Sequence, residues 1–489
     1  MILHKQLTLG DIYADCQNIF EENKPAFLSM LEEHINLDSY IPSTFWNRFH
    51  ASMGRSRKYP LTAFIWALVI QKIFSIPTDT LLLTILHYSK PLREFCGFTK
   101  VPDASKITRF KQDFLEDLQS VFERLVDVTE PICQAIDADK ADMTIFDSSG
   151  IEAWVRENNP KYADRIIRQL KAYAKAMNFD KSYDPYKAAY GSMPSCASVN
   201  SEIKQQYING HFCYAYKFGL VVNGLGIVRH IAFYNKDFLA AHPEIIVEKK
   251  SDSPDEDKSV HDARLLLPTL IDFFKAHPLI NPKTFLGDAS FDAVGIYRDL
   301  LTGDTFGTDR HFHKAYIPLN ERSGLENPDY TINEDGIPCC PNNPELPMKP
   351  EGTSKLKNGV VRFKFVCPNM KWQKCGNGKY QRVTLCENPC SPSTSGRMVY
   401  LYPEKDLRAF PGTVRGTQEW DDVYKTRCNV ERTICHFKEN LCIAGRRTQN
   451  EKTLHADLLL AGITQLLTVV VADKINKQEL IRSLKPLVA

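Results

Sequence analysis

The sequence of 489 residues predicts an α/β protein: an all-helical N-terminal domain, then a mixed sheet with flanking helices that is interrupted by a β-rich segment. Three observations predict this. Apolar residues recur at helical spacing up to about residue 130, strand-like runs begin near residue 140, and a Pro-, Gly- and Asn-rich segment holds six of the 14 cysteines. We therefore place the domains at 1–130, at 140–320 together with 407–475, and at 321–406.

The N-terminal domain is predicted from four amphipathic or apolar stretches, at residues 19–35, 61–74, 80–89 and 106–126. Lys106, Arg109 and Lys111 cluster in the first turns of the last stretch. The helix dipole disfavours cations there, whereas a phosphate backbone would favour them, so one reading is DNA contact. The other reading is a helical cap packed on the core.

Strand signals define the second domain, and two of them end in an aspartate. Asp147 closes the apolar run 141–148, and Asp288 follows the run 284–287. Between and after them we expect a hairpin around Gly224, a helix and a further strand, at residues 211–223 with 225–234, 260–276 and 311–319. An isolated aspartate at such a place is often only a turn or cap residue.

Near the C-terminus, Tyr424, Arg427, Glu431 and Lys438 lie at offsets of 0, 3, 7 and 14 residues. On a regular helix these offsets confine the four side chains to an arc about 60° wide. A carboxylate flanked by two cations and a phenol would be unfavourable on the buried face of a helix. It suits an acid that meets a metal beside a phosphodiester, with the cations neutralising the phosphates.

This spacing, Y-x2-R-x3-E-x6-K, resembles the signature of the YREK branch of insertion-sequence DDE transposases, and all four positions match. The resemblance extends from roughly residue 50 to residue 470, and it is strong at the three acidic segments and weak in the first 50 residues. It implies a ribonuclease H-like catalytic core in which Asp147 and Asp288 join Glu431.

The resemblance implies two Mg²⁺ or Mn²⁺ ions held by Asp147, Asp288 and Glu431, with Asp147 bridging both. The expected reaction is hydrolytic cleavage at the ends of a mobile element, followed by strand transfer into target DNA. Other acids could be mistaken for members of the site, namely Asp142, Asp292, Asp304 and Glu439.

The expected partner is double-stranded DNA, as terminal inverted repeats and as target, bound by a homodimer that pairs two element ends. Residues 424–453 carry an excess of basic residues, and we expect Tyr424, Arg427, Lys438, Arg446 and Arg447 to contact the DNA. For Arg446 and Arg447 a solvated helix face is the alternative. Two other functions stay open: a related nuclease that does not transfer strands, and a domesticated DNA-binding protein without catalysis.

The cysteines of the inserted segment predict a structural zinc. A small β-rich region with little apolar content needs another stabiliser, and tetrahedral thiolate zinc supplies one. The candidate ligands are four of Cys340, Cys367, Cys375, Cys386 and Cys390, with the first three preferred. The cysteines do not occur in pairs separated by two residues, as in zinc knuckles. The alternative is therefore that they are reduced and bind no metal.

Overall charge does not announce a nucleic-acid partner, because 61 basic and 59 acidic residues give a net charge of +2. Residues 1–10 lack the basic and apolar regions of an export signal. The most apolar stretches, 61–74 and 458–471, are too short and too polar for membrane spans. We expect a cytoplasmic, nucleoid-associated prokaryotic protein that does not enter a membrane.

Overall fold

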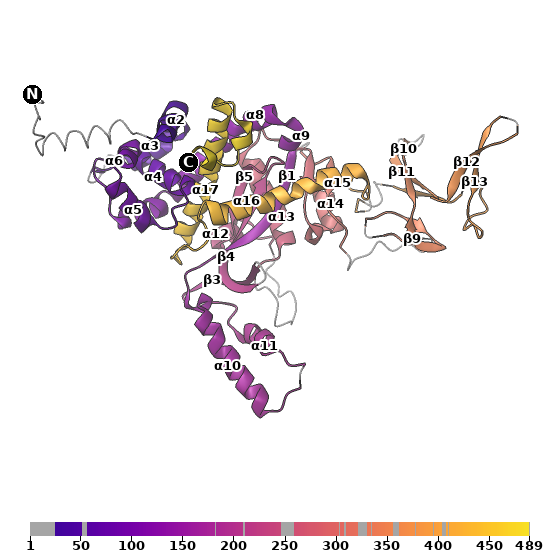
Figure 1. Cartoon of the computed structure of the whole chain (residues 1–489), viewed down its shortest axis with the longest axis horizontal. Helices are drawn as coiled ribbons and strands as arrows, with labels where there is room; N and C mark the ends of the chain where they lie inside the picture. Colours follow the sequence, from indigo (N-terminus) through magenta and orange to yellow (C-terminus); the bar gives the residue numbers. More distant parts are fainter. Residues whose placement is uncertain are drawn as a thin grey trace, which may run out of the picture. The chain divides into compact units, whose positions relative to one another are not determined.

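The protein is described from a computed structural model (Figure 1). Its contacts divide the chain into two compact units: unit 1 holds residues 1–138, 148–260 and 431–489, and unit 2 holds 139–147 and 261–430. The structure describes residues 25–50, 56–180, 182–208, 211–245, 259–302, 304–307, 310–320, 330–333, 335–355, 361–376, 378–394, 396–402, 407–408 and 410–488. Residues 1–24 of the predicted N-terminal domain therefore lie outside the described residues.

Helices dominate the described part of the N-terminal region, as the apolar periodicity predicts. Thr78 starts one of them by accepting a hydrogen bond from the backbone N–H of Leu81, and Gly97 ends another with φ +85°, a value that favours glycine. The helices are α2 (Ala26–His34), α3 (Ser43–Phe49), α4 (Leu61–Ile73), α5 (Asp79–Tyr88), α6 (Lys90–Cys96), α7 (Ala104–Asp113), α8 (Leu115–Ile136) and α9 (Ala138–Ala141).

A seven-stranded mixed sheet has the order β2-β3-β4-β1-β6-β7, with β5 paired to β4. The strands of unit 1 are antiparallel, whereas β1, β6 and β7 pair in parallel. The strands are β1 (Met143–Glu152), β2 (Cys196–Ala197), β3 (Asn200–Ile208), β4 (His211–Val222), β5 (Val228–Phe233), β6 (Thr284–Leu286) and β7 (Lys314–Tyr316). The predicted hairpin is β4 and β5, joined by the turn that contains Gly224.

Strand β1 is longer than the sequence indicates. We expected it to end at Asp147, but it continues to Glu152, because the residues after Asp147 also carry strand pairing and Gly150 and Ile151 are buried. Its first half, up to Asp147, belongs to unit 2, and its second half belongs to unit 1. The division falls at the residue that was expected to terminate the strand.

The remaining helices of the sheet region are α10 (Pro160–Ala176), α11 (Pro185–Ser192), α12 (Lys236–Ala241), α13 (Asp262–Ala276) and α14 (Val294–Leu301). The inserted region contains only strands among its described regular elements, in agreement with a β-rich segment. These are β8 (Cys339–Cys340), β9 (Asn343–Pro347), β10 (Lys349–Lys355), β11 (Val361–Val366), β12 (Met370–Lys374), β13 (Tyr380–Thr384) and β14 (Met398–Leu401). Strands β10, β11 and β14 form one antiparallel sheet, and β12 and β13 form a hairpin.

The segment with the Y-x2-R-x3-E-x6-K pattern is helical but not regular. It consists of α15 (Gln418–Tyr424), a 3₁₀ turn at Lys425–Arg427, α16 (Cys428–Cys435) and a π-helical turn at His436–Asn440. The angle of 100° per residue does not hold through 3₁₀ and π turns. The arc of about 60°, which assumes a regular helix, therefore does not describe the directions of these four side chains in the structure.

Helix α17 (Glu451–Lys474) forms the core of unit 1 and packs on α8 and α4. Its Gly462 permits the close approach, because an added Cβ would lie 2.7 Å from the ring of Phe122 in α8. By length and composition alone α17 could cross a membrane. However, 94% of its most apolar 18-residue stretch is buried within the protein, as is typical of a core helix.

Candidate active site

The register between β1 and β6 brings Asp147 and Asp288 together. The two strands are parallel, and Ile145 pairs with Leu286 in the last pair of their ladder. Asp147 and Asp288 each follow two residues later. Because parallel strands present their carboxyl ends at the same edge, the two aspartates occupy equivalent positions beyond the paired segment. Both lie in unit 2.

Each of the two carboxylates directs an oxygen at the same guanidinium group. Arg427 Nη2 lies 3.3 Å from Asp147 Oδ2 and 3.6 Å from Asp288 Oδ2. The two carboxylate oxygens cannot be farther apart than the sum of these distances. A single Arg427 side chain thus faces two acids, which leaves this group of three with a net negative charge.

Asp288 is oriented by the turn that it starts. Its Oδ1 accepts hydrogen bonds from the backbone N–H of Ser290, at 2.9 Å, and from the Ser290 hydroxyl, so that Asp288 caps a 3₁₀ turn at Ala289–Phe291. The capping role and the site role are compatible, because capping uses Oδ1 and Oδ2 faces Arg427.

Lys438 contacts the other half of β1, within unit 1. Its ammonium group donates a hydrogen bond of 2.7 Å to the hydroxyl of Ser149. Burial lowers the pKa of Lys438, although the nearby Glu152 and Glu439 act in the opposite direction. Ser149 lies two residues after Asp147, so the two side chains point to the same face of the strand. Ser149 is not among the site residues that the sequence predicts. Its position two residues after Asp147, on the same face of a strand, is the feature that could have identified it.

The third acid, Glu431, is exposed and lies on α16, one helical turn after Arg427. It belongs to unit 1, whereas Arg427 belongs to unit 2. Tyr424 is half-buried, and its ring stacks on Trp420 with centroids 6.2 Å apart. Its role as a DNA contact stays a prediction.

Asp142 and Asp292, the alternative acids nearest to the proposed pair in sequence, have structural partners. Asp142 accepts a hydrogen bond from the backbone N–H of Lys283 at 3.1 Å. Asp292 is buried and forms two hydrogen bonds with the guanidinium of Arg408, at 2.9 and 2.6 Å. Glu439 and Asp304 are exposed. Asp292 is thus the acid of a buried ion pair, whereas Asp147 and Asp288 share one cation.

The two arginines expected at DNA differ sharply. Arg446 is buried, and its guanidinium contacts Asp79 at 3.3 Å and Asp457 at 3.2 Å, so the solvated helix face considered for it is wrong. Arg447 places its guanidinium over the ring of the exposed Trp154, 5.8 Å from the centroid. Only Arg447 is placed where a nucleic acid could reach it without disrupting buried ion pairs.

Arg446 belongs to a cluster of buried charges in unit 1 that joins α4, α5, α7 and α17. Lys111 lies 2.8 Å from Asp79 and 2.9 Å from Asp457, and Lys72 lies 3.4 Å from Asp457. Burial lowers the pKa of Lys72 to about 7, assisted by Arg446 and Lys111, in spite of the ion pair with Asp457. The side chain of Lys111 is fully buried, so DNA contact by Lys111 is excluded and the packed helical cap is the correct reading for it.

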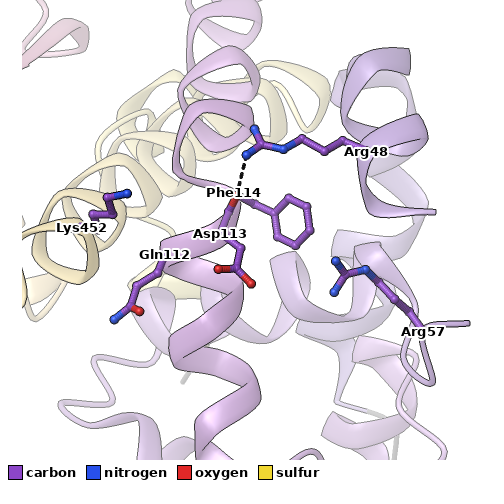
Figure 2. A pocket seen from close by; sticks show the side chains of 6 residues that line it. All are labelled: Arg48, Arg57, Gln112, Asp113, Phe114 and Lys452. Carbon is purple, nitrogen blue, oxygen red and sulfur yellow. Dashed lines mark hydrogen bonds between the residues drawn. The ribbon is translucent and has the colours of Figure 1, made fainter. Parts of the chain in front are cut away.

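A pocket of about 460 Å³ opens between helices of the N-terminal region and the start of α17, which supplies Lys452 (Figure 2). Two arginines line it, and the protein itself holds both. Arg48 donates to the carbonyl of Asp113 at 3.0 Å and pairs with Glu116 and Asp117, whereas Arg57 lies over the rings of Phe49 and Phe114. Both arginines are therefore engaged within the protein, whereas the lining residue Lys452 is exposed.

In the inserted region, electrostatic interactions link four of the five candidate zinc ligands, Cys340, Cys367, Cys386 and Cys390. The Asn342 side chain, two residues after Cys340, donates to the carbonyl of Asn388, and the Asn369 side chain, two residues after Cys367, donates to the Cys386 sulfur at 3.5 Å. Burial raises the pKa of Cys367 and of Cys390. Cys386 and Cys340 raise the pKa of Cys367 further, and Cys340 and Cys367 that of Cys390.

Cys375 lies apart from these contacts. It follows β12 at the tip of the β12–β13 hairpin, where its thiol donates to the side-chain oxygen of Gln381 at 3.4 Å. In the part of the chain that the structure describes, no three His, Cys, Asp or Glu side chains are grouped closely enough to hold a metal ion. Zinc and divalent-metal binding both stay predictions.

Comparison with known families gives one match, in the N-terminal region. The family model described as "Transposase domain (DUF772)" matches residues 15–113. This match supports a transposase. It lies on the helical region and does not reach the acidic segments. The comparison with curated proteins found no match.

Proposed function

We propose that this protein is a DDE transposase that cleaves the ends of a mobile element and joins them to target DNA. The observation that carries the proposal is the parallel register of β1 and β6, which places Asp147 and Asp288 at equivalent positions facing one guanidinium. The family match on residues 15–113 supports a transposase independently, because it does not include these residues.

Glu431 is proposed as the third carboxylate. It follows Arg427, the partner of Asp147, by one helical turn, and it precedes Lys438, the partner of Ser149. Asp147 and Ser149 lie on one face of β1. Along the sequence, Glu431 lies between Arg427 and Lys438, the residues that contact them.

The donor set fits Mg²⁺ or Mn²⁺, because hard divalent cations prefer carboxylate oxygens. When two such ions are bound, they activate a water or a DNA 3′-hydroxyl and stabilise the leaving oxygen. Asp147, Asp288 and Glu431 would hold the ions. Arg427 would then contact a DNA phosphate, and Lys438, Arg447 and Tyr424 would position the backbone. A homodimer would hold two element ends.

The proposal is tested with the purified full chain, Mn²⁺ and a duplex that carries the inverted repeats flanking the gene. We expect nicks at the repeat ends and, with target DNA added, joined products. Asp147→Ala should abolish both. Nicks without joined products would instead assign a nuclease, and binding without nicks would assign a non-catalytic DNA-binding protein. The three intact acids argue against that last function.

We propose further that Cys340, Cys367, Cys386 and Cys390 bind a structural zinc, which replaces Cys375 in the preferred set. Zinc binding would draw the four thiols together and overcome the raised pKa values of Cys367 and Cys390, since zinc displaces thiol protons. Metal analysis of purified protein should give one zinc per chain. Cys367→Ser should lose it and Cys375→Ser should keep it. Protein that neither contains nor takes up zinc would refute this assignment.

A further inference from the structure

Helices α10 and α11 form a helical hairpin between β1 and β2 to which the proposed mechanism assigns no role. The two helices pack on each other. A hydrogen bond of 2.8 Å from Lys171 to the hydroxyl of Tyr186 joins them, and the Lys171 ammonium lies 4.4 Å from the centre of the Tyr186 ring. Ile167 is the buried residue of α10, so most of this helix is exposed to solvent.

The exposed side of α10 is basic. Its sequence contains five basic residues and one acidic residue, Asp164. At 100° per residue, four of the basic residues fall within an arc about 80° wide. These four are Lys161, Arg165, Arg168 and Lys175, and we call them the α10 basic face; all four are exposed.

Within the described residues, none of the four cations of the α10 basic face forms an ion pair with an acidic side chain. Arg165 lies over the ring of Tyr162, 5.5 Å from its centroid, and this contact leaves its charge unneutralised. The contrast with Arg446, Lys111 and Arg427 is clear, because each of those cations faces carboxylates. The four charges are thus available to a polyanion.

The rest of the helix argues against a protein partner on this face. The large apolar side chains of α10 lie away from this face: the buried Ile167 and the exposed Tyr173 are each about 120° from Lys161 around the helix, in opposite directions. Protein interfaces are centred on apolar or aromatic anchors, and the α10 basic face has none. A row of cations without such an anchor is typical of contact with a phosphate backbone.

The length of the face also fits a duplex. Lys161 and Lys175 are 14 residues apart, about 21 Å along the helix axis. Over that length, double-stranded DNA carries about a dozen negative charges. Several cations of the face can therefore meet phosphates at once.

We propose that the α10 basic face binds the phosphate backbone of duplex DNA without reading its sequence. The inference rests on the proposed function, since it supplies a second DNA contact away from the carboxylates. Its role is to add affinity and position the duplex. Bases would be read elsewhere, because contacts to phosphate carry no sequence information directly.

The test is a salt titration of binding to a short duplex of random sequence, in the absence of divalent metal. For Arg165→Gln with Arg168→Gln we expect the slope of log affinity against log salt to fall by about two, because each lost phosphate contact removes close to one unit. The matched control, Arg165→Lys with Arg168→Lys, keeps both charges and should keep the slope. Equal melting temperatures would establish that all variants are folded.

An unchanged slope in the glutamine variant would overturn the proposal, and so would a change of oligomeric state without loss of DNA binding. Neither result affects the proposed catalytic function if the wild-type chain still nicks repeat-end DNA with Mn²⁺. Conversely, a wild-type chain that binds random duplex but never cleaves would leave the α10 basic face supported and the catalytic function refuted.

Discussion

Two groups of charged residues in this protein have opposite organisation. The buried cluster of Lys72, Lys111, Arg446, Asp79 and Asp457 sets three cations against two carboxylates, with contacts of 2.8–3.4 Å. In the candidate active site, Asp147 and Asp288 both face Arg427, at 3.3 and 3.6 Å. Apart from Asp79, whose side chain is 22% exposed, the first group is buried, whereas all three members of the second are partly exposed.

The difference indicates what each group is suited to do. The buried cluster ties the N-terminal helices to α17, so removing one member leaves a charge buried without its partner, which is costly. In the candidate active site two carboxylates face the same guanidinium, and carboxylate oxygens are the ligands that hard divalent cations prefer. Substitutions in the two groups should therefore affect different measurements.

The largest expected effect is the loss of DNA cleavage in Asp147→Asn. Replacing a proposed metal-binding carboxylate should reduce Mn²⁺-dependent nicking on the order of 10³-fold or more, with little change in stability. The control is Asp142→Asn, which alters a neighbouring acid that accepts a hydrogen bond from Lys283. The activity of that control should stay within a few-fold of wild type. Equal nicking by both variants would contradict the proposed site.

Next in size is the loss of stability in Asp457→Asn. Asp457 is 1% exposed, and its removal leaves Lys111, Arg446 and Lys72 without their shared carboxylate. We expect the free energy of unfolding to fall by about 3–5 kcal/mol, measured by urea denaturation. Asp473→Asn, at the exposed end of the same helix, should change it by less than about 0.5 kcal/mol. If the Asp457→Asn variant is as stable as the wild type, the cluster does not hold the helices together.

A smaller effect is expected on metal affinity in Arg427→Gln. Loss of the guanidinium removes a positive charge that faces both Asp147 and Asp288, so Mn²⁺ should bind about tenfold more tightly to the DNA-free protein. Isothermal titration with Mn²⁺ would measure it. Arg432→Gln removes the same charge from an exposed position on α16 and should leave the affinity almost unchanged. Weaker binding in Arg427→Gln would mean that this arginine supports the metal site.

A last expected effect is a pH dependence of stability that arises in the buried cluster. Burial lowers the pKa of Lys72 in the folded state to about 7 from its ordinary value of 10.5. Between these values the unfolded chain binds more protons than the folded one, so this residue makes stability rise as pH increases from about 7 toward 10.5. Lys72→Met should flatten that rise in urea denaturation measured across the range. An equally steep rise in the variant would assign it to other groups.

Local features of the structure could be predicted from the sequence. The apolar periodicity of residues 61–74 corresponds to α4, and the runs around Gly224 correspond to the β4–β5 hairpin. The identity of a local element depends on residues a few positions apart, which a pattern contains. The length of β1 could not be predicted in this way, because Ser148–Glu152 extend a strand through pairing with a distant part of the chain.

The candidate site likewise has some features that the sequence predicts and others that it does not. The acids and the helical segment were recognisable from residue types and spacing, and so was the β-rich character of the cysteine-bearing insertion. The separate placement of Cys375 was not, because it depends on which strands pair in the hairpin. Nor was the burial of Arg446, since its partners Asp79 and Asp457 come from α5 and α17.

By itself, then, the sequence determined which side chains are candidates for the chemistry and which segments are helical or extended, since both follow from residue type and short-range periodicity. Only the tertiary structure decided how those side chains are partnered: the parallel register that aligns Asp147 with Asp288, the arginine they share, and the arginine that lies buried instead of facing DNA. Such pairings join residues far apart in the chain, where charge and burial depend on three-dimensional packing rather than on neighbouring sequence.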